Sequence, residues 1–300
     1  MTARAARAGP AGFLEGVLRR ALGDAALAVR EVERVGGGCI HHAVRVRTTR
    51  GDWFAKWNHD CAPDLFPSEA EGLRALRKTA SELAIPEVLV ALHPGEQHPA
   101  CIVMEYLPPG AGAAADEVRL GRGLAAIHAG PAPAFGFPVT TYCGSTPQDN
   151  RESPTWPAFY AERRILALAR RLEREERIDP GERGVLERVA DRLPELLAHE
   201  TRPALIHGDL WSGNVLATAR GPALVDPACA ACDREMEFGI TTLFGGFSAR
   251  FFDAYEEALP LPGGWRDRNP LYQLYHLLNH HLIFGGHYGR EALSLARRFA

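Results

Sequence analysis

The sequence lacks the features that would place a protein at a membrane. Residues 1–10 hold arginine and alanine but no apolar segment of the kind that a secretory signal peptide carries. Elsewhere no apolar run approaches the roughly 20 residues that a membrane-spanning helix needs. We therefore expect a cytoplasmic protein with no membrane partner.

The chain also has little net charge of either sign. Lys and Arg number 34 against 37 Asp and Glu, a formal net charge of −3. Nucleic-acid-binding proteins concentrate basic residues on one face, so we expect no nucleic-acid partner. The 300 residues are 46% hydrophobic, which is enough to bury a large core in two lobes.

Cysteine is scarce, at six residues. Cys229 and Cys232 form a Cys-x-x-Cys pair, but no second pair and no flanking histidine accompany them. A lone pair of this kind is weak evidence for zinc, and no βαβ pattern surrounds it to indicate thioredoxin-like chemistry. Cys101 lies in an apolar run and is expected to be a core residue.

Residues 207–214, His-Gly-Asp-Leu-Trp-Ser-Gly-Asn, form a segment typical of phosphoryl transfer. Asp209 can accept a proton from a substrate hydroxyl, and Asn214 at the end of the same loop can bind Mg²⁺ through its amide oxygen. The apolar stretches 215–217 and 223–225 predict a hairpin that returns Asp226 to the side of Asn214, where it can share the metal. The alternative is a turn in which Asp209 only caps backbone amides, but a turn does not explain the spaced Asn and the second Asp.

The parts of an ATP site precede this loop in a fixed order. Alternating stretches at 27–32 and 43–48 predict two strands joined by a turn. That turn holds Gly36, Gly37 and Gly38. Glycines let backbone N–H groups approach phosphates closely. The next strand, at 53–57, carries Lys56 among apolar residues. We interpret Lys56 as the ammonium that holds the α- and β-phosphates, rather than as a solubilising residue of an edge strand.

A helix is predicted over residues 66–76, where Leu73 and Leu76 supply an apolar edge. Glu69 lies one turn before Leu73 and can face inward to pair with Lys56. Glu71 is the alternative partner. We prefer Glu69, because an exposed first-turn carboxylate such as Glu71 would merely suit the helix dipole.

The apolar strand that ends near residue 107 runs into Pro-Pro-Gly at 108–110. This position corresponds to the segment that links the lobes of a kinase, where backbone groups bind adenine. The expected adenine-binding residues are Glu105, Tyr106 and Leu107. We therefore predict an N-lobe over residues 1–106 and a C-lobe over 107–300.

The C-lobe is predicted to be mainly helical, with a Gly-, Pro- and Thr-containing loop at 135–153 as the expected substrate flap. Its predicted helices cover residues 117–128, 156–176, 182–199, 235–245, 248–258, 270–284 and 289–298.

Several of these segments together resemble the fructosamine kinase family. They are Gly-Gly-Gly-Cys-Ile at 36–40, Val-Met-Glu-Tyr-Leu at 103–107, residues 207–214, Asp-Pro-Ala at 226–228, Leu-Phe-Gly-Gly-Phe at 243–247 and residues 271–280. The resemblance implies an α+β, bilobal protein-kinase-like fold with a small antiparallel-sheet N-lobe and a larger, mainly helical C-lobe. It also implies phosphorylation of the C3 hydroxyl of a ketoamine by ATP with Mg²⁺, a step that returns the free amine. The ketoamine can be a small molecule or a glycated protein lysine, and we expect a ribulosamine in preference to a fructosamine.

Two other functions stay open. The first is a kinase of the same frame that acts on an aminoglycoside or on choline, which the Leu-Trp-Ser at 210–212 disfavours. The second is a non-catalytic nucleotide-binding pseudokinase. The presence of Lys56, Asp209, Asn214 and Asp226 disfavours it, because pseudokinases typically lose one of these residues.

Substrate contacts are harder to predict. Trp211 could pack on the sugar or amine chain, or it could be a core residue that holds the loop. Asp233 and Glu235, which form an acidic cluster with Glu237, could attract a cationic substrate, although capping of the next helix is the favoured interpretation. The polar triplet Asn279, His280 and His281 lies on an apolar helix, so it could reach the site or its two histidines could face the surface.

Cys39 follows the glycine turn directly. Backbone N–H groups arranged for phosphate would also stabilise a thiolate, so two such loops could join through a disulfide. The alternative is a thiol that never reacts in a reducing cytoplasm. We therefore expect a monomer or a redox-dependent homodimer.

Overall fold

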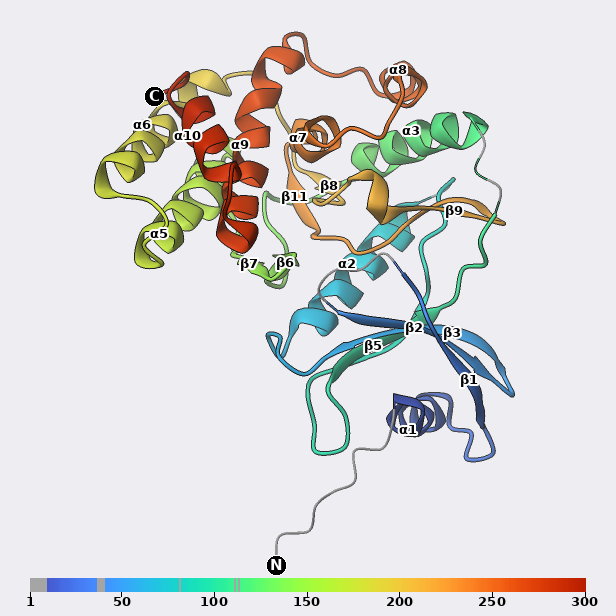
Figure 1. Cartoon of the computed structure of the whole chain (residues 1–300). Helices are drawn as coiled ribbons and strands as arrows, with labels where there is room; N and C mark the ends of the chain where they lie inside the picture. The colour runs from blue at the N-terminus through green and yellow to red at the C-terminus, as the bar shows by residue number, and fades with distance from the viewer. Residues whose placement is uncertain (1–9, 37–40, 81, 111, 113) are drawn as a thin grey trace, which may run out of the picture.

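The computed structural model describes residues 10–36, 41–80, 82–110, 112 and 114–300 of the chain. A five-stranded antiparallel sheet forms one lobe and a group of helices forms the other, as the α+β prediction requires (Figure 1). The sheet has the order β1-β2-β3-β5-β4. Its strands are β1 (Val29–Arg34), β2 (His42–Thr48), β3 (Gly51–Asn58), β4 (Val88–Leu92) and β5 (Ala100–Glu105).

Alternation along β2 decides which way each side chain of this strand faces. Val44 and Val46 are buried, while Arg45 and Arg47 lie between them on the opposite face. Arg45 pairs with Glu33 of β1 at 3.5 Å, and Arg47 pairs with Glu33 at 3.0 Å. These pairs are partly exposed and contribute little to stability, so the register follows from the buried valines.

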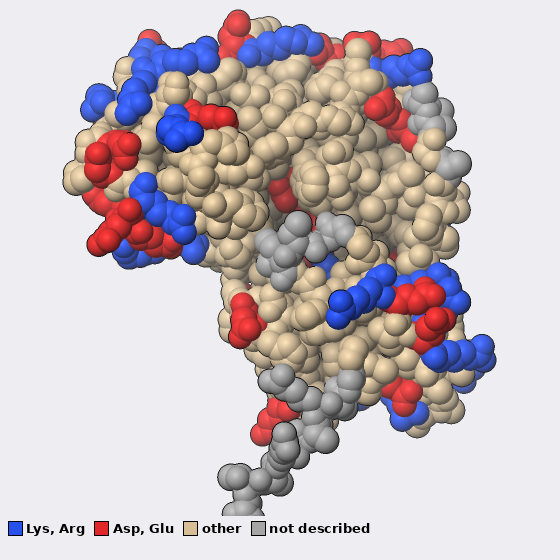
Figure 2. All heavy atoms as spheres, in the orientation of Figure 1, with Lys and Arg blue, Asp and Glu red and all other residues tan. Residues whose placement is uncertain are grey.

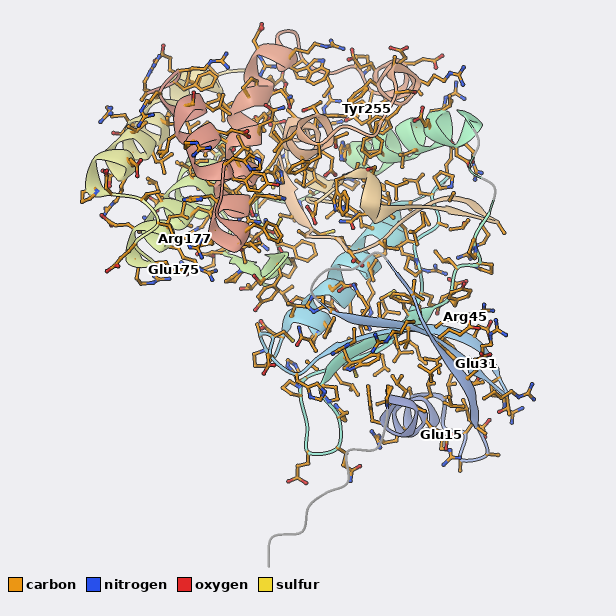
Figure 3. The ribbon with its side chains drawn as sticks, in the orientation of Figure 1. Glu15, Glu31, Arg45, Glu175, Arg177 and Tyr255 are labelled. Carbon is orange, nitrogen blue, oxygen red and sulfur yellow. The ribbon has the colours of Figure 1, made fainter. Side chains whose placement is uncertain are left out.

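Two helices cover the sheet, one on each side (Figure 1). Helix α1 (Pro10–Leu22), which the sequence analysis did not predict, packs with the core that contains the β2 valines. Its Glu15 accepts a hydrogen bond from the backbone N–H of Val29 at 2.8 Å, which fastens α1 to β1 (Figure 3). Helix α2 (Leu65–Thr79) joins a second core that continues into the helical lobe.

The helical lobe begins with α3 (Ala114–Ala129) and ends with α10 (Tyr288–Ala296). The helix predicted at 156–176 is divided into α4 (Trp156–Tyr160), a π-helical segment η1 (Ala161–Ile165) and α5 (Leu166–Arg174). The remaining helices are α6 (Pro180–Leu196), α7 (Glu235–Leu243), α8 (Ala249–Ala258) and α9 (Trp265–Phe284). A capping box between Asp179 and Glu182 starts α6.

The described part of the helical lobe also contains three short antiparallel strand pairs. The predicted hairpin is present as β9 (Val215–Thr218) and β10 (Gly221–Leu224). Strand β8 (Ala204–Ile206) pairs with β11 (Ala230–Cys232), and the segment predicted as a substrate flap holds β6 (Thr141–Cys143) and β7 (Thr146–Gln148). Among the described residues, no helix has both the length and the apolar character to cross a membrane.

Candidate active site

A cavity of about 830 Å³ lies between the sheet and the helical lobe. Figure 2 shows the surface hollowed at this place, with charged side chains in its depth. Six large apolar side chains are exposed among the described residues, and all but Leu22 line this cavity. They are Val35, Trp211, Leu216, Phe244 and Phe284. Exposed apolar surface that gathers in one hollow is typical of a ligand site.

Lys56 projects from β3 into this cavity and is buried between two carboxylates. Its Nζ lies 2.7 Å from Oε1 of Glu69 on α2 and 2.6 Å from Oδ1 of Asp226. Glu71 instead pairs with Arg74 on the exposed side of α2 at 2.6 Å, so Glu69 is the partner. Burial opposes the charge on Lys56, yet Asp226 and Glu69 together raise its pKa above the usual range. Burial raises the pKa of Glu69 to about 7, although Lys56 opposes that rise.

Asp226 follows β10 in a left-handed backbone conformation, with φ of 56°. Asp adopts this conformation more readily than most residues, at a cost that is seen most often at functional sites. The side chain is 45% exposed and opens into the cavity. Partial burial of the carboxyl group raises the pKa of Asp226, but the neighbouring Lys56 ammonium lowers it, and the net change is downward. The carboxylate is therefore charged at neutral pH.

Asp209 faces the same cavity from the loop after β8. Its Oδ2 accepts a hydrogen bond from Nδ2 of Asn214 at 3.2 Å, and Sγ of Cys143 lies 3.8 Å from its Oδ1. Burial, and then the negative charge of Asp226, raise the pKa of Asp209 to about 7. A carboxylate with such a pKa suits proton transfer at neutral pH.

Asn214 ends the short helix η2 (Ser212–Asn214), just before β9. Its Nδ2 also donates to the backbone oxygen of Asp209 at 2.9 Å, so the amide nitrogen is committed to Asp209. The amide oxygen is then the group left for a cation. Together with the exposed carboxylate of Asp226 it provides hard oxygen donors, which fit Mg²⁺.

A buried carboxylate, which the sequence analysis placed only in the acidic cluster after Asp226, holds this loop in place. Glu237 on α7 accepts hydrogen bonds from the backbone N–H groups of His207 at 2.6 Å and Gly208 at 2.9 Å. Gly208 has φ of 82°, and a Cβ there would meet the backbone oxygen of Ala228 at 2.3 Å. Only glycine therefore fits at position 208, where the backbone N–H binds Glu237 directly before Asp209 in the chain.

We expect Glu237→Ala to lower the free energy of unfolding by about 3 kcal/mol or more, because two hydrogen bonds to a charged acceptor are worth roughly 1.5–3 kcal/mol each. Urea denaturation followed by circular dichroism measures the change. Glu187→Ala is the control, since Glu187 forms a surface pair with Arg183 and should change stability by less than about 0.5 kcal/mol. Equal losses in both variants would contradict the anchoring role of Glu237.

The predicted adenine-binding segment lines the cavity at the end of β5. The backbone N–H of Glu105 donates to the oxygen of Glu87 at 2.8 Å, so this N–H belongs to the sheet. The side chain of Glu105 pairs with Arg220 at 3.0 Å. Tyr106 and Leu107 are the residues whose backbone is left for a base, and the guanidinium of Arg45 lies 4.4 Å from the centre of the Tyr106 ring (Figure 3).

The structure places two of the four predicted substrate residues in the cavity and two outside it. Trp211 lines the cavity and is 39% exposed, so it is not a core residue. His280 also lines the cavity and packs on Phe244, with 4.8 Å between the ring centres. Asp233 and Glu235 are buried and do not line it, so the prediction that they attract a cationic substrate is not supported.

Asp233 and Glu235 have their partners inside the helical lobe. Asp233 binds Nε2 of His199 at 2.7 Å and accepts from the hydroxyl of Tyr272 at 2.7 Å. Glu235 accepts from Nε of Arg268 at 2.9 Å. Asp233 also accepts from the backbone N–H of Glu235 at 3.0 Å, but Arg234 is the N-cap residue of α7, so Asp233 binds the first turn from one residue before the cap.

Gly36 lines the cavity, whereas Gly37, Gly38 and Cys39 lie outside the described residues. The disulfide hypothesis for Cys39 therefore stays a prediction. His41 and Cys143, which the sequence analysis did not assign to the site, also line the cavity, and so does Asn279 of the polar triplet. Cys143 belongs to the predicted flap, but no local pattern connects it with Asp209, from which 66 residues separate it.

Comparison with known proteins gives a consistent result. The family model described as fructosamine kinase matches residues 15–299. A Vibrio parahaemolyticus protein named "Probable ketoamine kinase" is 38% identical over 272 residues, which cover 88% of this chain and 90% of the relative. The chloroplastic protein-ribulosamine 3-kinase of Arabidopsis thaliana is 35% identical over 274 residues, which cover 89% and 82% of the two chains.

Solved structures agree with this result. A Thermobifida fusca protein described as a "putative fructosamine-3-kinase" superposes with a TM-score of 0.83 at 35% identity, covering 94% of this chain and 98% of the other. The aminoglycoside phosphotransferase APH(2'')-Ib with bound ADP superposes with a TM-score of 0.62 at 13% identity, covering 97% and 99%. The second likeness shows the protein-kinase-like fold alone.

Proposed function

Because this chain belongs to the fructosamine kinase family, we propose that it transfers the γ-phosphoryl group of ATP to the C3 hydroxyl of a ketoamine. The observation that carries the proposal is the meeting of three elements in one cavity: the Lys56–Glu69 pair, Asp209 with Asn214, and Asp226. Lys56 binds the α- and β-phosphates, while the backbone of Tyr106 and Leu107 receives adenine.

Asp209 takes the proton of the acceptor hydroxyl. The hydroxyl oxygen then bonds to the γ-phosphorus, the bond from that phosphorus to the β,γ-bridging oxygen breaks, and ADP leaves with the bonding electrons. Asn214 and Asp226 would hold Mg²⁺, which when bound neutralises charge on the phosphates. Because the pKa of Asp209 is raised to about 7, this carboxylate is a stronger base than an ordinary aspartate.

The apolar side of the cavity supports a ketoamine as the acceptor. Trp211, Phe244 and Phe284 provide aromatic surface there, and Lys56 is the sole Lys or Arg among the described residues that line the cavity. The amine nitrogen of a ketoamine is cationic when protonated, and a cation over an aromatic face is attracted to it without a carboxylate. Such a wall also accepts the alkyl chain of a glycated lysine.

The experiment that tests the function is ATP turnover with ribulose-, erythrulose- and fructose-lysine, with kanamycin and choline as alternative acceptors. We expect kcat/KM to be highest for ribulose-lysine, with product phosphorylated at C3 by NMR. The amine should then be recovered, because a phosphate at C3 leaves more readily than a hydroxyl does. Turnover of kanamycin or choline with none of any ketoamine would favour the alternative kinase. Absence of turnover with all five acceptors despite ATP binding would favour a pseudokinase.

A further inference from the structure

Three side chains with metal-binding atoms meet beside the proposed base. They are Cys143 of β6, Asp209 and His276 of α9, and one ligand atom from each lies within 4.8 Å of the other two. Sγ of Cys143 is 3.8 Å from Oδ1 of Asp209. The three residues come from distant parts of the chain, so the folded structure alone creates this cluster.

His276 of this cluster and Asn279, which contacts Cys143, each have a buried polar atom that lacks a hydrogen-bond partner among the described residues. Nδ1 of His276 has none among the described residues, and this side chain is 1% exposed. Oδ1 of Asn279, one turn further along α9, has none either, while Nδ2 of Asn279 donates to the backbone oxygen of Cys143 at 3.2 Å. Leaving buried polar atoms unsatisfied costs about 1–3 kcal/mol each, so these two atoms would gain from a ligand bound beside Cys143.

The donor set of one sulfur, one nitrogen and one oxygen selects a particular class of ion. Zinc binds thiolate, imidazole and carboxylate at about 2.0–2.3 Å in tetrahedral geometry, which places the donor atoms roughly 3.5 Å apart. The separation of 3.8 Å between the Cys143 sulfur and the Asp209 oxygen is close to that value. Mg²⁺ prefers oxygen ligands and does not compete well for a thiolate.

We propose that Cys143, Asp209 and His276 form an inhibitory site for Zn²⁺ or a similarly soft divalent cation, distinct from the oxygen donors of Asn214 and Asp226. Asn279 or water takes the fourth position. The Cys143 thiol releases its proton to solvent as the sulfur–metal bond forms, and the thiolate and the Asp209 carboxylate then balance the charge of the ion. A metal-bound carboxylate is no longer available to take a proton from the acceptor hydroxyl.

The inhibitory part of this proposal rests on the proposed function of Asp209, whereas metal binding does not. Binding is therefore measured first, without ATP or acceptor, on chelator-treated protein with Co²⁺ as a spectroscopic probe. We expect thiolate-to-cobalt charge transfer and tetrahedral d–d bands that Zn²⁺ abolishes. Cys143→Ser and His276→Gln should each weaken binding by about 100-fold or more, since loss of even an outer-sphere partner costs roughly 10–100-fold.

Cys61→Ser is the matched control, because Cys61 is a half-buried thiol that does not line the cavity, and it should bind the probe as the wild type does. Thermal unfolding identifies any variant that fails to fold, and two independent ligand variants keep the test decisive. Absence of the charge-transfer band in the wild type overturns the site and leaves the proposed function intact. So does a band that disappears with Cys39→Ser rather than with Cys143→Ser.

Inhibition is measured next at fixed Mg·ATP with buffered Zn²⁺, as the ratio of turnover with and without zinc within each protein. We expect inhibition of the wild type and of Cys61→Ser that a chelator reverses, and loss of that inhibition in His276→Gln. Zinc that binds at this site without slowing turnover would overturn the inhibitory role and would also count against Asp209 as the base. Ketoamine turnover in the zinc-free wild type tests the proposed function separately.

Discussion

Replacing Asp209 with Asn is expected to reduce kcat by about 10²–10⁴-fold, the range that a positioned acid or base contributes. The substitution keeps the volume of the side chain and leaves an oxygen that can accept from Asn214. It removes only the ability to take a proton. The Kd for Mg·ATP should be unchanged, because Lys56 pairs with Glu69 and Asp226 rather than with Asp209. Turnover is measured by ADP release with ribulose-lysine, and nucleotide binding by calorimetry.

The control for this variant is Asp191→Asn, an exposed aspartate on α6, which should retain wild-type turnover. The pH profile of the wild type gives a second readout. The base must be ionised, and burial raises the pKa of Asp209 to about 7, so kcat/KM should rise with pH through that value and then level off. A profile that is flat between about pH 6 and 8, or near-normal turnover by Asp209→Asn, would exclude Asp209 as the base.

Replacing Asp226 with Asn is expected to reduce turnover by about 10²-fold or more, because a preorganised charge at the phosphates commonly contributes that much. Asn keeps the shape of the side chain and tolerates the left-handed backbone at φ of 56°, so the fold should be retained. Mg·ATP should bind more weakly. ATP without metal should bind as tightly as in the wild type or more tightly, because Asp226 no longer repels phosphates or competes for Lys56.

These opposite signs separate a metal-binding role from a loss of structure. Calorimetry measures the Kd of Mg·ATP, and the Kd of ATP in excess chelator, for the wild type and for the variant. Glu71→Gln is the matched control, since Glu71 is the acidic residue of α2 that pairs at the surface, and it should change neither value. Equal weakening of both binding events in Asp226→Asn would show that Asp226 acts through the shape of the loop instead of through the metal.

The parts of the site that the sequence could predict are those whose geometry is local. Asp209 and Asn214 lie on one loop, and the hairpin that follows has a register set by its turn, so the return of Asp226 to the cavity follows from spacing. Glu69 was distinguishable from Glu71 because helical periodicity decides which of the two faces the sheet. These inferences need no knowledge of the rest of the fold.

The parts that the sequence could not predict depend on distant partners. Asp233 and Glu235 look like an acidic patch beside the metal site, but Arg268 lies 33 residues beyond Glu235, and His199 lies 34 residues before Asp233. Burial with such partners turns an apparent binding surface into internal scaffolding. The meeting of Cys143 with Asp209 and His276 is equally non-local, because it needs β6, the loop that carries Asp209 and α9 to be packed together.

Because Glu237 anchors the loop of residues 207–214, the loop can take its folded shape only after Glu237 has been synthesised. His207 and its anchor are 30 residues apart, with the hairpin β9–β10 and strand β11 between them. During synthesis, the loop that carries Asp209 therefore emerges well before the carboxylate that holds it. Domains fold as units as the chain is produced, so the loop of residues 207–214 acquires its shape only once α7 has been translated and packed. A chain that ends between β9 and α7 would contain all of residues 207–214 and yet lack the geometry of this loop.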